Sequence, residues 1–244
     1  MKIHILRCGT IHIPKSLNPL TGRITLPVWC YLVEHPVHGY ILVDTGLGTM
    51  QLPGHLKRHY RPKADPTILE QLKKRGVSPC DLSMVLLSDL DIDHTGGIHT
   101  LKEARRFLVS EEEYYWTART VFSRRQPRSL WESNIKLEAY YLRGTGWGPA
   151  KHALDLFGDG SIVSVLTRGH TFGNCTTMLR WNGKTLLLAG NTVRSGKTLE
   201  NDYVFHHYQQ DKSVQWLRTE RAKAGCLGVL ATHDTEERER VIEL

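Results

Sequence analysis

The stretch Ser88-Asp89-Leu90-Asp91-Ile92-Asp93-His94-Thr95-Gly96-Gly97 decides how this 244-residue chain is interpreted. It follows residues 84–87, a continuous apolar run that is typical of a strand buried on both faces. If the stretch stays extended, the alternation of side chains places Asp89, Asp91 and Asp93 on one face. Carboxylates this close repel one another unless a cation neutralises them or water screens them. The pattern therefore indicates a hard cation with oxygen ligands, and the alternative is a solvated acidic turn.

Two histidines follow apolar runs elsewhere in the chain. His170 lies in Arg168-Gly169-His170-Thr171, and His233 lies in Ala231-Thr232-His233-Asp234. Both are expected at the same sheet edge as the acidic stretch. A lone histidine after a strand is more often structural than a metal ligand, but several that converge with an acidic turn favour a metal site.

The pattern of elements predicts an α/β (α+β) fold in two β-rich halves. Each half consists of strands followed by a helix, which is typical of sheet packed on sheet with helices outside. Predicted strands cover residues 28–34, 40–44, 84–88, 106–109, 161–166, 176–181, 184–189 and 227–232. Predicted helices cover residues 65–74 with Asp65 as the N-cap, a segment opened by a Ser110–Glu113 capping box, and residues 211–224. We expect a single domain, residues 1–244, with an irregular helical insert at about 110–150.

The composition is that of an ordinary globular protein. Hydrophobic residues make up 40%, and Lys+Arg exceed Asp+Glu by 32 − 25 = 7. Disorder and a membrane span are not expected, because no low-complexity tract and no apolar run of about 20 residues occur. The basic charge is spread out, so nucleic-acid binding is not favoured, and nothing indicates an oligomeric state. Five scattered cysteines without a leader predict a reducing, cytoplasmic location.

The order of short motifs resembles the metallo-β-lactamase fold superfamily. Within it, the chain is most similar to the N-acyl-homoserine-lactonase-like hydrolases. The resemblance implies an αββα sandwich with a metal site at the sheet edge between the halves. It runs through Val43-Asp44-Thr45-Gly46, residues 88–97, 156–160, Gly169-His170-Thr171-Phe172-Gly173, Ala189-Gly190-Asn191-Thr192 and Thr232-His233-Asp234.

The resemblance also assigns roles, with departures from the family's HxHxDH pattern. The first two histidines of that pattern fall on Asp89 and Asp91, and the bridging aspartate falls on Asn191. The tyrosine that assists lactone opening falls on Arg194. The metal ligands implied by resemblance are Asp89, Asp91, Asp93, His94, His170, Asn191 and His233.

One or two divalent ions are the expected cofactors. A first site of Asp89, Asp91 and His170 is rich in oxygen and favours manganese, iron or magnesium over zinc. A second site of Asp93, His94 and His233 suits zinc or iron. The resemblance suggests that Asp44 orients a ligand, and a cap on the turn at Thr45-Gly46 is the alternative.

The expected function is metal-dependent hydrolysis of a small ester or lactone through a metal-bound hydroxide. Asp93 would orient the nucleophile and pass a proton to the leaving group. Arg194 would stabilise an oxyanion or bind an acidic substrate, unless it is an ordinary surface arginine. The alternatives are a catalytically degenerate binding or scaffold protein, iron redox chemistry of the flavodiiron kind, and an RNA-processing nuclease.

Overall fold

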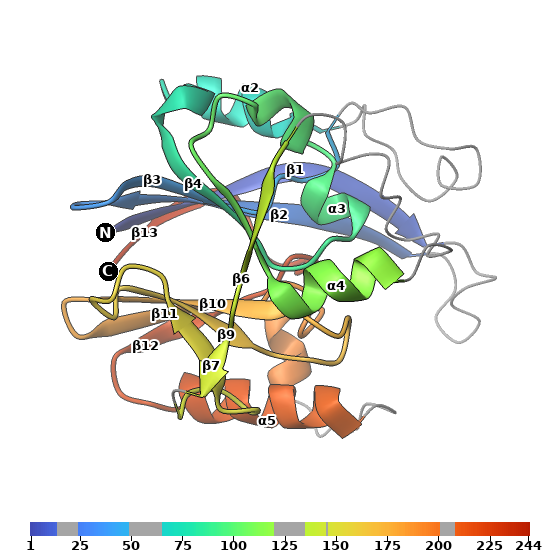
Figure 1. Ribbon diagram of the computed structural model, residues 1–244, viewed down its shortest axis with the longest axis vertical. Helices are drawn as coiled ribbons and strands as arrows, with labels where there is room; N and C mark the ends of the chain where they lie inside the picture. The colour runs from blue at the N-terminus through green and yellow to red at the C-terminus, as the bar shows by residue number, and fades with distance from the viewer. Residues whose placement is uncertain (14–23, 49–64, 120–134, 145, 201–207) are drawn as a thin grey trace.

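The computed structural model describes residues 1–13, 24–48, 65–119, 135–144, 146–200 and 208–244, and its strands form two sheets (Figure 1). The strand order is β13-β1-β2-β3-β4-β5-β6 in the first sheet and β12-β11-β10-β9-β8-β7 in the second. The strands of the first sheet are β1 (Lys2–Ile13), β2 (Ile24–His35), β3 (Gly39–Val43), β4 (Leu82–Leu87), β5 (Phe107–Ser110), β6 (Leu137–Tyr140) and β13 (Arg240–Glu243). Those of the second are β7 (Arg143–Gly144), β8 (His152–Asp155), β9 (Ile162–Leu166), β10 (Cys175–Trp181), β11 (Lys184–Leu188) and β12 (Cys226–Leu230).

The first sheet is buried on both faces because its strands are apolar at successive positions. In β3, Ile41 and Val43 join the core between the two sheets. Leu42, which points the other way, joins a separate core with Ile68 and Leu72 of helix α2 (Ile68–Lys73). Side-chain alternation thus makes one strand serve two cores.

The second sheet repeats this arrangement on the opposite side. Leu186 and Leu188 of β11 face the first sheet, whereas Leu187 packs outward. Its outer core includes Val214 and Leu217 of helix α5 (Tyr208–Arg221), the long helix below the second sheet in Figure 1. The layers are therefore helix, sheet, sheet, helix, and the predicted αββα sandwich is confirmed.

Most predicted elements are present, with differences at their ends. Helix α2 begins one residue after Thr67, whose hydroxyl accepts the Glu70 N–H, so the expectation of Asp65 as the N-cap is wrong. Thr67 is the N-cap because Glu70 completes a capping box with it. The hairpin between β10 and β11 turns at Asn182-Gly183, and both residues have the positive φ that a tight hairpin requires.

The region predicted as an irregular insert is only partly described. Residues 120–134 and 145 lie outside the described residues, and the rest holds α4 (Glu111–Arg119), β6 and β7. β6 pairs with β5 at the edge of the first sheet, and β7 pairs with β8 at the edge of the second. The single-domain organisation stays a prediction. Within the described ranges, no helix combines the length and apolar character needed to cross a membrane.

Candidate metal centre

The acidic stretch leaves β4 and turns into a helix instead of staying extended. The Asp91 N–H donates to Asp89 Oδ1 over 2.9 Å, and the N–H groups of His94 and Thr95 both donate to the Asp91 carbonyl. Helix α3 (Ile92–Thr95) therefore begins directly after Asp91. The expected alternation over three aspartates is wrong, because short acidic side chains bind nearby backbone N–H groups and start a turn. All three aspartates and His94 are nevertheless buried.

Two glycines let this loop pack against the loop that follows β3. A Cβ on Gly96 would lie 2.1 Å from the Leu47 carbonyl oxygen, and one on Gly97 would lie 2.3 Å from that of Thr45. Thr45 donates both its N–H and its hydroxyl to the His94 carbonyl, each over 2.8 Å. Close backbone approach thus explains the Gly-Gly pair and fixes the α3 turn.

Asp44 fixes the orientation of the His94 ring through a contact with Nδ1. Its Oδ1 accepts the Ser88 N–H over 2.8 Å, and its Oδ2 accepts the Ser88 hydroxyl over 2.8 Å. Asp44 Oδ2 lies 2.9 Å from His94 Nδ1, and both side chains are buried. A hydrogen bond from Nδ1–H to this carboxylate leaves Nε2 to bind a cation. Asp44 therefore orients His94, as the resemblance suggests.

His233 approaches from the second sheet and is held in the same way. It follows β12, and its Nδ1 lies 2.8 Å from the Pro27 carbonyl oxygen, which can only accept. Its Nε2 lies 3.1 Å from Asp93 Oδ2, and His94 Nε2 lies 3.5 Å from the same oxygen. One ligand atom from each of Asp93, His94 and His233 lies within 4.8 Å of the others. Two oriented imidazoles and a carboxylate fit a divalent ion such as zinc or iron.

The other predicted ligands lie beside this set and contact it through Asn191. Asn191 Nδ2 lies 2.8 Å from His94 Nε2, 3.1 Å from His170 Nε2 and 3.3 Å from Asp89 Oδ2. His170 Nε2 lies 3.1 Å from Asp91 Oδ2. The structure thus gathers the seven predicted ligands. Arg194 is different, because its side chain is exposed and has no hydrogen bond or ion pair within the described ranges.

Glu113 is a further buried carboxylate of the centre and is not among the predicted ligands. Its buried carboxylate accepts the Leu90 N–H over 3.1 Å, the Thr171 hydroxyl over 2.6 Å and the Gly173 N–H over 3.1 Å. It therefore joins the acidic loop to the loop that carries His170. In the sequence, Glu113 matches a capping box with Ser110. The Glu113 N–H donates to the Ser110 hydroxyl over 3.2 Å, as in such a box, while its carboxylate accepts hydrogen bonds from these loops.

The charges of the centre shift its pKa values in opposite directions. Burial raises the pKa of Asp89 to about 7, with His94 opposing the rise and Asp91 adding to it. Burial also raises the pKa of Glu113 to about 7. For Asp93 the effect of burial is outweighed by His94 and by the hydrogen bond with His233, so its pKa lies below the usual range. For His94 burial is outweighed by Asp89, Asp44 and Asp93, so its pKa is raised, which is a preference for positive charge.

A second His–Asp group lies at the other end of the sheets. It consists of His35, His38 and Asp159. His35 Nδ1 accepts the N–H groups of residues 37 and 38, each over 3.1 Å, so a neutral imidazole carries its proton on Nε2 and offers no lone pair there. This group therefore stabilises the β2–β3 turn.

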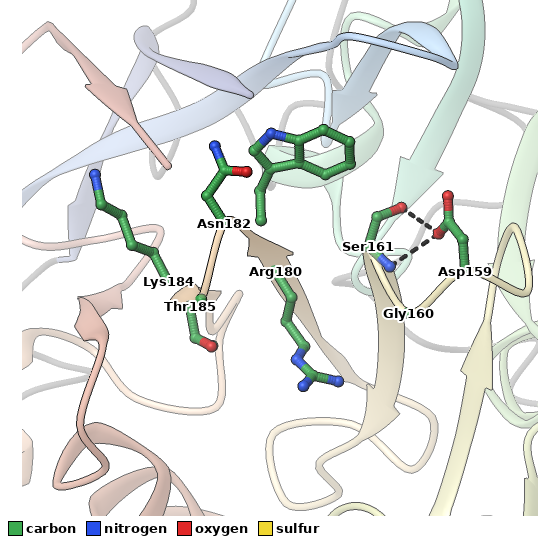
Figure 2. Close-up of a pocket in the computed structure, with 9 residues that line it drawn as sticks. Asp159, Gly160, Ser161, Arg180, Asn182, Lys184 and Thr185 are labelled. Carbon is green, nitrogen blue, oxygen red and sulfur yellow. Dashed lines mark hydrogen bonds between the residues drawn. The ribbon is translucent and has the colours of Figure 1, made fainter.

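The adjacent pocket does not concentrate positive charge. Asp159 accepts the Ser161 N–H and hydroxyl there, whereas Lys184 and Arg180 extend in opposite directions (Figure 2). The pocket therefore does not form an anion site from these two cations.

Replacement of Glu113 tests its structural role. We expect Glu113→Gln to lower the free energy of unfolding by about 1–3 kcal/mol at pH 8, because an amide cannot accept all three donors. Glu112→Gln on the same helix is the matched control. Glu112 pairs with Arg168 at a partly exposed position, so the loss should stay below about 1 kcal/mol. Urea denaturation measures both, and equal losses would contradict the assignment.

The raised pKa values predict how the stability of the metal-free protein depends on pH. Asp89 and Glu113 have pKa values of about 7 in the folded protein, against 3.8 and 4.5 when unperturbed. The folded state therefore keeps protons that the unfolded chain releases. Their stabilisation is complete below the unfolded values and is lost as the pH rises through about 7. The urea midpoint of the chelator-treated protein should therefore decrease as the pH is raised from about 5 to about 8, and it should decrease less in Asp89→Asn. An increase of the midpoint over this pH range would refute the assignment.

The geometry agrees with the comparisons to known proteins. A family model described as the metallo-beta-lactamase superfamily matches residues 23–224. The N-acyl homoserine lactonase AttM of Rhizobium radiobacter is 25% identical over 97% of this chain and 94% of its own length. A solved structure of an N-acyl homoserine lactone hydrolase, with N-hexanoyl-L-homoserine at its catalytic metal center, has a TM-score of 0.76 at 21% identity over 96% of this chain and 94% of that one. The dizinc quorum-quenching lactonase AidC has a TM-score of 0.64 at 17% identity over 96% and 87%. The chain belongs to the metallo-β-lactamase superfamily.

Proposed function

We propose that the chain is a metal-dependent hydrolase that opens a small ester or lactone. One observation carries the proposal: His94 and His233 are each held through Nδ1, so that both Nε2 atoms lie beside the Asp93 carboxylate. The lactonase names of the relatives support an ester or lactone as the substrate class.

The chemistry divides between the ion and the side chains. A divalent ion held by Asp93, His94 and His233 would supply Lewis acidity, which polarises a carbonyl oxygen and makes water a stronger nucleophile. In the metal-free protein His94 and His233 lower the pKa of Asp93, so its carboxylate is ionised near neutral pH and available to a cation. It can accept the proton of the attacking water and return it to the leaving alkoxide. Asp44 acts through His94, whose tautomer it fixes.

The apolar part of the substrate would lie against helix α4. A pocket there is lined by Phe172, two residues after His170, and by Glu111, Glu112, Tyr115, Trp116 and Arg119 of α4. Tyr115 and Phe172 are exposed, and their rings contact the Tyr114 ring and the Arg168 guanidinium, respectively. Arg194 stays a proposal: as an exposed cation it would bind an acidic group of the substrate.

A catalytically degenerate binding protein is the second candidate. The observation that favours it is the neutral Asn191 at the position where the resemblance implies a bridging carboxylate. Such a protein would bind a lactone at the same pocket without turnover.

Hydrolysis of a lactone and ester panel by the zinc- and manganese-loaded protein separates the two candidates. Asp93→Asn should lower kcat/KM at least about 100-fold, because an amide cannot accept the proton. His38→Asn at the distant β2–β3 turn is the control and should leave kcat/KM unchanged, since His38 contacts Asp159 and not the metal centre. No turnover by any loaded wild-type protein, or equal rates in wild type and Asp93→Asn, would contradict the hydrolase proposal.

A further inference from the structure

The ligands predicted for the two metal ions meet at an amide nitrogen, that of Asn191. Asn191 Nδ2 lies at hydrogen-bonding distance from three of them: His94 Nε2 at 2.8 Å, His170 Nε2 at 3.1 Å and Asp89 Oδ2 at 3.3 Å. Asn191 is 7% exposed, so this contact is shielded from water. A hydrogen-bond donor therefore sits at the junction between the two predicted sites.

The orientation of this amide is set by its neighbours. Asp89 can only accept a hydrogen bond when ionised, so an N–H group of Asn191 facing it is favourable. Whichever way its amide is turned, the side chain of Asn191 carries no net charge, so it cannot bridge two cations as a carboxylate does.

The ligand atoms predicted for the oxygen-rich site do not cluster as closely as those of the Asp93–His94–His233 set. Within the described ranges, only two groups bring three ligand atoms within 4.8 Å of one another: the Asp93–His94–His233 set and the His35 group at the β2–β3 turn. Asp89, Asp91 and His170 do not form such a group. Asp89 uses Oδ1 for the Asp91 N–H and Oδ2 for Asn191.

The charge of the side chains also disfavours a second divalent ion. Two divalent ions a few ångströms apart repel strongly unless an anion lies between them. A bridging carboxylate supplies that anion, whereas the side chain of Asn191 is neutral. Asp89 and Asp91 add negative charge, but the side chain that contacts both His94 and His170 is the neutral Asn191.

We propose that this chain binds one divalent ion, at Asp93, His94 and His233, and that Asn191 with Asp89, Asp91 and His170 forms a hydrogen-bonded network in place of a second ion. The inference rests on the metal-binding part of the proposed function and not on turnover. The dizinc relative AidC would then differ from this chain in the number of ions, while the two share the fold.

Native mass spectrometry of chelator-stripped protein reloaded with excess Zn²⁺ tests the proposal, with elemental analysis of the same samples. We expect one zinc per chain in wild type and in Asp89→Asn, and none in His233→Ala. Asn191→Asp should bind two, because it restores a bridging carboxylate. Asn191→Ala should still bind one, because it removes the amide without adding charge.

Three results would overturn the proposal. These are two zinc ions per wild-type chain, a single ion that survives in His233→Ala but is lost in Asp89→Asn, and an Asn191→Asp protein that still binds one. Circular dichroism confirms that each variant is folded before counting. Turnover by a two-zinc wild-type protein would refute this inference and leave the proposed function standing, whereas one zinc without turnover would do the reverse.

Discussion

The buried hydrogen bond between Asp44 and His94 is the interaction on which the candidate centre depends. Asp44 follows β3 and Ser88 follows β4, and these strands are parallel neighbours with Val43 paired to Leu86. The two residues therefore leave the sheet side by side, and Asp44 adopts the left-handed conformation at φ 62°. This conformation is uncommon for a residue with a side chain, and the bonds to Ser88 and His94 offset its cost.

The second sheet completes the centre, so its packing on the first sheet sets the distances between ligands. The Trp29 N–H of β2 donates to the Thr232 carbonyl over 3.0 Å, and the Trp29 indole donates to the Asp234 carbonyl over 2.9 Å. His233 lies between these two residues, so Trp29 holds its backbone from both sides. The Cys175 N–H donates to the Ser88 carbonyl over 2.9 Å. This hydrogen bond joins the start of β10 in the second sheet to the loop that follows β4 in the first.

The sequence predicts the sandwich and the meeting of its loops, because both follow from patterns that act over a few residues. Apolar runs at 84–87 and 186–189 identify buried strands, and polar residues after them gather where the strands end. The family resemblance adds the identity of the ligands. Its fold and its superfamily are confirmed.

What the sequence could not supply are contacts between distant segments. The alternating aspartates of residues 89–93 match an extended pattern, yet a bond from Asp89 to the Asp91 N–H starts helix α3. Glu113 matches a capping box, yet its partners are loops 23 and 58–60 residues away in the chain. No local rule predicts the pairing of β13 with β1, which joins the two ends of the described chain. The role of Arg194 stays a prediction for the same reason.

The most direct test of the account is anomalous diffraction at the zinc absorption edge from crystals of the zinc-loaded protein. We expect a peak about 2.0–2.2 Å from His94 Nε2, His233 Nε2 and an Asp93 carboxylate oxygen. A peak at His35, His38 and Asp159, or the absence of a peak at the Asp93 set in zinc-soaked crystals, would contradict the claim that Asp44 and the two sheets orient these residues to bind a metal ion.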